Sequence, residues 1–270
     1  MADTAPEALV RHAGALVVAA LVALTLLAWL ALLAGAGTDM DPAAMSFWLV
    51  PTALLPALSS PWTPAYWLIA FFMWAVMMVA MMLPSAAPMV LLYARVVRRG
   101  GNQGRPMRAP ASIAAFASGY LTLWIHFSVL AVALQVGLER EGAMTAMMSS
   151  RSLLLSGTLL IAAGLYQLTP LKAACLKHCR GPAEFIAAHW RPGVLGAWRM
   201  GLTHGAYCVG CCAVLMLLLF VGGVMNLIWI AGLTLFVAIE KLAPFGPAAA
   251  KAMAALLVAG GSTLLVLGQT

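Results

Sequence analysis

The chain has 270 residues, of which 64% are hydrophobic and only 9% are charged, and its formal net charge is +7. Soluble domains carry about a quarter charged residues, so this composition excludes an ordinary soluble protein. Because no polar tract is long enough for a separate soluble domain, we expect one integral membrane domain over residues 1–270, with the lipid bilayer around it and no nucleic-acid partner.

Seven apolar segments follow one another along the chain, and several reach the roughly 20 residues that a helix needs to cross a bilayer. They cover residues 13–34, 65–93, 111–138, 152–169, 200–221, 225–241 and 251–266. The expected fold class is therefore all-α, a polytopic membrane helix bundle of about seven transmembrane helices. Two alternatives stay open: a cleaved signal peptide ending near 34–36, and a re-entrant hairpin over 246–262 in place of the last helix.

The distribution of basic residues predicts the orientation of this bundle. If the N-terminus is inside, all of the 15 Lys and Arg residues other than Arg140 and Arg151 fall in inward-facing segments. Positive charge concentrates in the cytoplasmic loops of membrane proteins. We therefore expect the N-terminus inside and the C-terminus outside.

The second segment contains a methionine-rich stretch. Met77 and Met81 are four residues apart, as are Met78 and Met82, so each pair lies on one face of a helix. Pro84 lacks a backbone N–H, so we expect a kink here, with free carbonyl groups that need a partner or line a cavity. Taken alone, such a stripe is more often packing than a set of metal ligands.

The fifth segment carries an imidazole and three thiols on one helical face. His204, Cys208, Cys211 and Cys212 have the spacing i, i+4, i+7 and i+8. Thiolate and thioether ligands select soft ions, with Cu(I) the leading candidate. The alternative is that these cysteines are buried as small hydrophobic residues.

The two sulfur stripes are expected at a similar depth in the membrane. Met82 lies roughly 20 Å along a helix from Arg95, and Cys211 lies roughly 18 Å from Arg199. Both arginines mark inner ends. The stripes can therefore form one site if their helices are neighbours, which the sequence does not decide.

A second group of sulfur ligands lies in a basic segment, 170–199, which we expect to be an inner loop. Cys175, His178 and Cys179 fall within one helical turn of each other, and nearby cations such as Lys177 favour thiolates. This group predicts a separate docking or transfer site outside the bilayer core. The alternative is an ordinary basic loop with incidental cysteines.

One carboxylate lies near the inner end of the sixth segment. Glu240 is an intramembrane acid, and such residues are functional by default. A structural ion pair with Lys172, Lys241 or Lys251 is an equally open interpretation.

Four sequence blocks together resemble a known family. They read Trp74-x-x-Met77-Met78-x-x-Met81-Met82-x-Pro84, Tyr166-Gln167-x-x-Pro170-x-Lys172-x-x-Cys175-x-x-x-Cys179-x-x-Pro182, Gly205-x-Tyr207-Cys208-x-Gly210-Cys211-Cys212 and Glu240-Lys241. The chain is similar here, over about 65–241, to the bacterial family of predicted metal-binding integral membrane proteins known as domain of unknown function 2182. The resemblance implies a multi-pass protein of the bacterial inner (cytoplasmic) membrane that binds metal, with copper the foremost candidate, and no established reaction.

The sequence therefore predicts a Cu(I)-binding protein that acts in copper transport, delivery or cuproprotein assembly, with a metallochaperone or cuproprotein as partner. No glycine-rich phosphate loop is present, so we expect a binding protein without catalytic residues rather than an ATPase. Two alternatives are a membrane thiol–disulfide oxidoreductase that uses Cys208 and Cys211, and a scaffold subunit. The predicted metal ligands are Cys208, Cys211, Cys212, His204, Met77, Met78, Met81, Met82, Cys175, His178 and Cys179.

Overall fold

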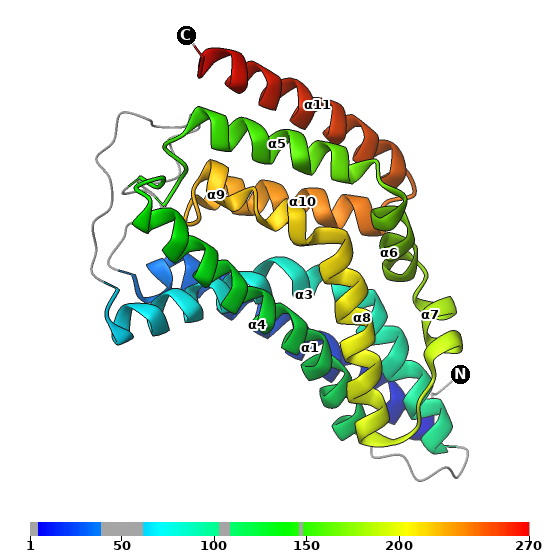
Figure 1. The fold of residues 1–270 in the computed structure, drawn as a ribbon. Helices are drawn as coiled ribbons and strands as arrows, with labels where there is room; N and C mark the ends of the chain where they lie inside the picture. Colours follow the sequence, from blue (N-terminus) through cyan, green and yellow to red (C-terminus); the bar gives the residue numbers. More distant parts are fainter. Residues whose placement is uncertain (1–4, 39–61, 103–108, 146–147, 270) are drawn as a thin grey trace.

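The computed structural model describes residues 5–38, 62–102, 109–145 and 148–269, and its regular elements there are all helices (Figure 1). The expected all-α class is confirmed. The elements are α1 (Ala5–Leu33), η1 (Gly35–Gly37), α3 (Pro64–Asn102), α4 (Ala109–Arg140), α5 (Leu153–Gln167), α6 (Pro170–Arg180), α7 (Pro182–His189), α8 (Gly193–Met216), α9 (Leu219–Gly222), α10 (Leu227–Leu242) and α11 (Gly246–Leu267).

Among the described residues, five helices are long and apolar enough to cross a membrane: Gly14–Leu33, Pro64–Gly100, Ala109–Arg140, Gly193–Gly222 and Gly246–Leu267. The bent pair of α5 and α6 raises the number to six if it counts as one span. Helices lie at all seven predicted positions, but α10 has only 16 residues, so the seven-span count stays a prediction. The re-entrant alternative for 246–262 is wrong, because α11 is one continuous helix of 22 residues.

The segment 170–199 is not a loop, and the reason lies in two prolines. Pro170 and Pro182 occupy the first turns of α6 and α7, where a missing N–H does no harm. The Thr169 side chain accepts a hydrogen bond from the N–H of Lys172 and caps α6. Because α5 ends just before this cap, the two helices meet at an angle of 64°. The bend turns α6 onto α8.

Helix α4 packs against both α3 and α8, and its contact with α8 is the most extensive in the bundle. A Cβ atom on Gly119 would lie 2.2 Å from the carbonyl oxygen of Trp198, and one on Gly201 would lie 2.1 Å from that of Phe116. Only glycine permits this approach of the two backbones. The position of α4 therefore determines how α3 and α8 are placed relative to each other.

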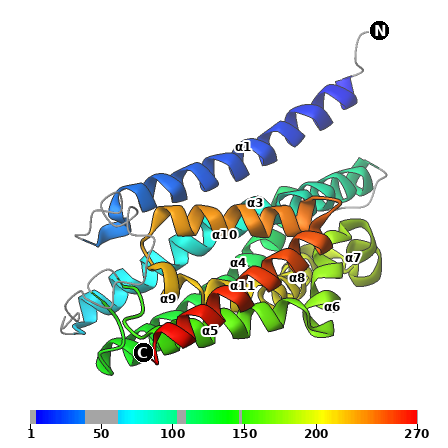
Figure 2. The same ribbon diagram turned by 90° about the horizontal axis from the view of Figure 1, so that it is seen from above.

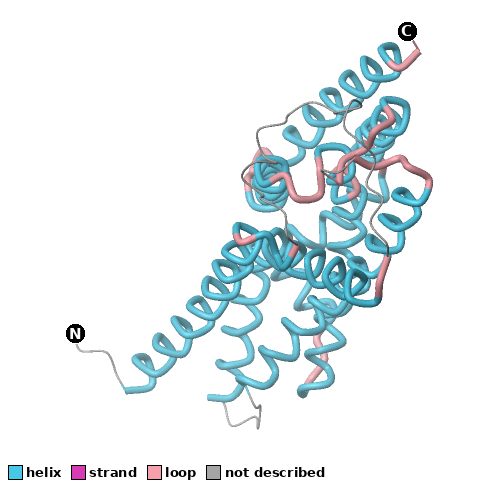
Figure 3. Tube along the Cα trace, turned by 90° about the vertical axis from the view of Figure 1, so that its left-hand side faces the viewer, coloured by secondary structure: helices cyan, strands magenta, loops and turns pink. Residues whose placement is uncertain are grey.

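The outer helices flank this centre on opposite sides. Figure 2 shows α1 along α3 on one side, and α5 with α11 on the other. The start of α1 and the end of α11 lie at opposite ends of the molecule in Figure 3. Between these flanking helices, one buried core contains both the methionine stripe of α3 and the cysteines of α8.

Candidate metal centre

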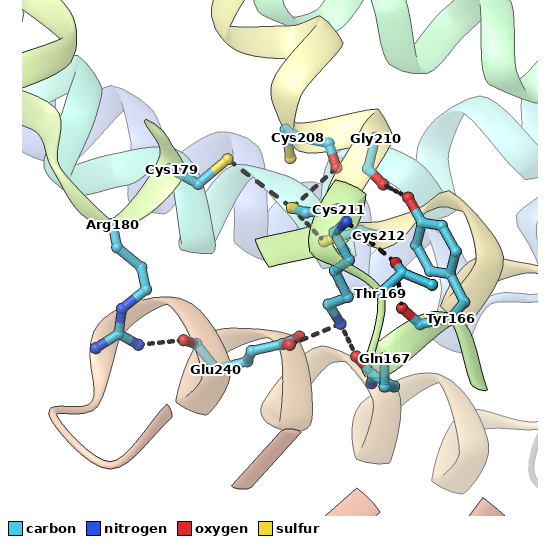
Figure 4. Close-up of polar contacts among 11 residues, drawn as sticks. Tyr166, Gln167, Thr169, Cys179, Arg180, Cys208, Gly210, Cys211, Cys212 and Glu240 are labelled. Carbon is cyan, nitrogen blue, oxygen red and sulfur yellow. Dashed lines mark hydrogen bonds and ion pairs between the residues drawn. The ribbon is translucent and has the colours of Figure 1, made fainter. Parts of the chain in front are cut away.

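Four thiols from two helices meet inside the bundle. The Sγ atoms of Cys179 on α6 and Cys211 on α8 are 3.9 Å apart, and those of Cys211 and Cys212 are 3.3 Å apart (Figure 4). The Cys211 thiol also donates to the carbonyl oxygen of Cys208 at 3.3 Å. All five cysteines are free thiols, and Cys208, Cys211 and Cys212 are buried. The two sulfur groups that the sequence separates therefore form one cluster in space.

The close approach of α6 to α8 depends on Gly210. A Cβ atom at this position would lie 2.8 Å from the Sγ atom of Cys175. The Tyr166 hydroxyl, at the end of α5, donates to the carbonyl oxygen of Gly210 (Figure 4). Cys175 thus lies beside the cluster but remains half-buried, between the surface and the fully buried thiols.

Cys208 has two polar partners that sequence reasoning missed. The Nζ atom of Lys241 lies 3.0 Å from its Sγ atom, and the hydroxyl of Tyr120 lies 3.1 Å from it. Lys241 also donates to the Ser85 hydroxyl at 3.1 Å, and Tyr120 donates to the carbonyl oxygen of Met82 at 3.1 Å. Tyr120 carried no recognisable signal, and Lys241 was considered only as a partner for Glu240.

These contacts decide how the methionine stripe relates to the cysteines. Helix α4 packs against both α3 and α8, and Tyr120 of α4 joins the backbone of Met82 to Cys208. The carbonyl of Met82 also accepts from the Ser85 hydroxyl, in the turn where α3 passes through Pro84. Met77, Met78, Met81 and Met82 are fully buried in the same core as the cysteines. The stripes are thus connected through side chains of neighbouring helices.

A buried ion pair anchors α6 beside the thiols. The Nζ atom of Lys172 lies 2.6 Å from Oε1 of Glu240, with Lys172 1% exposed and Glu240 0% exposed. Lys172 also donates to the side-chain oxygen of Gln167. Arg180 donates to the carbonyl oxygen of Glu240 (Figure 4) and to that of Ala243. Of the three lysines considered for Glu240, Lys172 is its partner. The pair joins α6 to α10.

The two predicted histidine ligands lie against aromatic rings. His204 is buried and its ring stacks on Tyr120 with centroids 5.5 Å apart, while its Nδ1 atom has no hydrogen-bond partner. His178 stacks on Tyr207 with centroids 4.1 Å apart. Within the described ranges, no group of three or more His, Cys, Asp or Glu side chains is arranged around a common ion position. An ion bound by the thiols would therefore have to replace their present mutual contacts.

Comparison with protein families supports a copper-related role. The family model PpoB2, described as a copper chaperone, matches residues 71–264, which include all five cysteines and most of α3 to α11. No curated protein and no solved structure matches the chain. The resemblance to domain of unknown function 2182 stays a prediction.

Proposed function

The chain belongs to the copper chaperone family PpoB2, and from this premise we propose that it binds Cu(I) at the four thiols and passes the ion to a partner. The observation that carries the proposal is the convergence of Cys179 with Cys208, Cys211 and Cys212 in a buried core. Thiolates are ligands that Cu(I) prefers over harder ions. The role is copper transport, delivery or cuproprotein assembly, with a metallochaperone or cuproprotein as the partner.

The charge around the cluster supports a thiolate complex. A Cu(I) ion held by two or more thiolates is anionic, and a buried anion needs a counter-charge. The ammonium group of Lys241 lies 3.0 Å from Cys208 Sγ and is itself almost fully buried. The positive charge of Lys241 would thus balance the negative charge of the copper–thiolate complex.

The exposure of the sulfurs suggests a path for the ion. Cys175 and Cys179 on α6 are half-buried, whereas Cys211 is fully buried. An ion taken up at α6 would meet Cys179 first and then Cys211, which is 3.9 Å further. His178 lies on the same short helix and would line the approach. Met77, Met78, Met81 and Met82 would continue the path, and His204 would be a further ligand.

We place this protein in the bacterial inner membrane, with seven helices, the N-terminus inside and the C-terminus outside. The support is the basic residues, of which only Arg140 and Arg151 fall on the outer side in this arrangement. It puts α6 at the inner side, so the thiols would face a reducing compartment.

Copper analysis of the purified protein tests the proposal. Protein purified anaerobically in detergent and loaded with Cu(I) should retain the ion against a chelator and show copper–sulfur scattering in X-ray absorption. Changing Cys208, Cys211 and Cys212 together to Ser should abolish the ultraviolet absorption of copper–thiolate bonds. His126→Ala is a matched control, because this exposed histidine binds only a carbonyl of its own helix. Unchanged copper–thiolate absorption in the cysteine variant would contradict the proposal.

A thiol–disulfide oxidoreductase is the second candidate, and one contact favours it. The Sγ atoms of Cys179 and Cys211 are already near each other, so oxidation could join α6 to α8. Substoichiometric copper together with a disulfide at Cys211, found by mass spectrometry, would favour this function. Unchanged copper tolerance of cells that carry the triple Cys→Ser variant would favour a scaffold role.

A further inference from the structure

A second buried polar group lies toward the C-terminal end of α4, beyond Tyr120. Its centre is the side chain of Gln135, which is 0% exposed. Its oxygen accepts from Nε1 of Trp74 at 2.8 Å, and its Nε2 atom donates to Oε1 of Glu139 at 2.9 Å. The same Nε2 atom lies 3.7 Å from Sδ of Met148. One buried amide nitrogen therefore contacts both a carboxylate and a thioether.

The backbone holds Met148 in a conformation that its side chain does not favour. Its φ is 52°, in the left-handed region that residues with a Cβ rarely adopt. Its N–H donates to the carbonyl oxygen of Thr145 at 2.9 Å, and its carbonyl accepts from Val224 at 3.2 Å. The backbone two residues further on is also fixed by a hydrogen bond, which the N–H of Ser150 donates to the carbonyl oxygen of Phe220 at 2.7 Å. A strained backbone conformation of this kind persists only where several surrounding contacts hold the residue in place.

Other buried methionines belong to the same core as Met148. Met144 is 1% exposed in the same loop as Met148, which is also 1% exposed. The same core contains other buried methionines from α3, α8 and the segment before α10, namely Met73, Met77, Met216 and Met225. Thioethers are soft ligands that suit Cu(I).

The charge at this end is the reverse of that at the thiols. The carboxylate of Glu139 is 7% exposed, and it accepts from Trp62 Nε1 at 3.0 Å and from Gln135. Among the described residues both of these partners are neutral N–H donors, and no Lys, Arg or His pairs with Glu139. Thioethers are neutral, so a Cu(I) ion bound by them keeps its positive charge and needs a buried anion. Glu139 is that anion.

We propose that Met148 and Met144, with Glu139 as the counter-charge, form a second Cu(I) site, made of thioethers and distinct from the cysteine cluster. The identity of the cargo rests on the proposed function. The methionine stripe of α3 lies between the two sites: Trp74 contacts Gln135 at one end, and Met82 contacts Tyr120, the neighbour of Cys208, at the other. These two contacts are roughly 12 Å apart along the helix.

The chemistry suits a site of release. In the proposed topology the Glu139 end faces outward, toward an oxidising compartment. Thiols there are open to disulfide formation, whereas thioethers cannot form disulfides and remain ligands. Cu(I) would thus be taken up by thiols inside and released from thioethers outside.

The test uses full-length protein in which Cys175, Cys179, Cys208, Cys211 and Cys212 are all Ser. Loaded anaerobically with Cu(I) against a graded chelator, it should retain copper with sulfur scattering but without the ultraviolet absorption of copper–thiolate bonds. Met148→Leu should weaken this binding by about tenfold or more, and so should Glu139→Gln. Met89→Leu is the matched control, since Met89 is equally buried but belongs to a different core cluster. Leu nearly conserves the volume of Met, and thermal unfolding checks that the variants fold.

The outcomes separate the two proposals. If wild-type protein binds copper through thiolates but the cysteine-free protein binds none, the second site is wrong and the proposed function stands. Equal affinity in the Met148→Leu, Glu139→Gln and Met89→Leu variants would likewise overturn it. If wild-type and cysteine-free proteins bind the same single thioether-bound copper, the second site stands and the thiol centre is wrong.

Discussion

The ammonium group of Lys241 lies 3.0 Å from the sulfur of Cys208, and both side chains are buried. Lys241 comes from the end of α10 and Cys208 from the middle of α8. A cation beside a thiol in a dry core favours the thiolate over the neutral thiol. This contact gives the cysteine cluster a fixed counter-charge, and it makes Lys241 a positioning residue for the proposed copper ion.

Changing Lys241 to Met should weaken Cu(I) binding by about 10- to 100-fold, because the thiolate complex loses its buried counter-charge. Arg keeps the charge, so Lys241→Arg should recover part of the affinity. The measurement is competition with a Cu(I) chelator at constant pH. Lys251→Met is the control, since Lys251 is an exposed cation at the start of the next helix. Equal affinities for Lys241→Met and the control would show that Lys241 has only a packing role.

Removing one partner of the buried ion pair should destabilise the bundle. Glu240→Gln leaves the ammonium group of Lys172 buried without its carboxylate, which typically lowers the free energy of unfolding by about 3–5 kcal/mol. Thermal unfolding in detergent measures the effect. The double variant Lys172→Met with Glu240→Leu should recover much of the loss, because no unpaired charge remains. Glu184→Gln, an exposed carboxylate on α7, should unfold like wild type; a comparable loss there would argue against the ion pair as the cause.

Placing a methyl group on Gly210 should separate α6 from α8. In Gly210→Ala the new Cβ would lie 2.8 Å from the Cys175 sulfur, so the Cys175 side chain or the helix must shift, at a cost of about 1–3 kcal/mol. Copper retention should fall with it, because Cys179 would move away from Cys211. Adding Cys175→Ala should restore both properties, since the nearest remaining atom is the Cys175 Cβ at 3.5 Å. Gly232→Ala, which meets no atom within 4 Å, is the control. Failure of the second change to rescue would refute this steric account.

The topology predicts different labelling of two single cysteines introduced into a cysteine-free background. Glu141→Cys, just after α4, should react with a membrane-impermeant maleimide added to intact cells lacking the outer membrane. Arg191→Cys, before α8, should react only after the membrane is opened, because basic segments stay inside. Both positions are exposed, so burial does not limit the reaction. The reverse pattern would place the thiol cluster at the outer side and would contradict the proposed direction of copper movement.

Much of the site could be predicted because helix geometry is local. A spacing of three and four residues puts Cys208, Cys211 and Cys212 on one face wherever the helix lies, and the structure has all three in one buried cluster. The structure of the basic segment 170–199 was harder to predict. Its charge suggested a loop, whereas Pro170 and Pro182 begin helices α6 and α7. Proline is common at the first position of a helix, so the sequence did contain a signal for these two helices.

The sequence by itself determined the helical class, the apolar segments and the faces that carry sulfur, because these depend on neighbours within a turn or two of the chain. Only the tertiary structure decided that Cys179 joins Cys211, since this requires the 64° bend between α5 and α6 and the missing side chain of Gly210. The roles of Tyr120 and Lys241 were likewise decided by packing. Which helix faces which depends on the fit of whole surfaces, such as the glycine contacts between α4 and α8, and no local pattern encodes that fit.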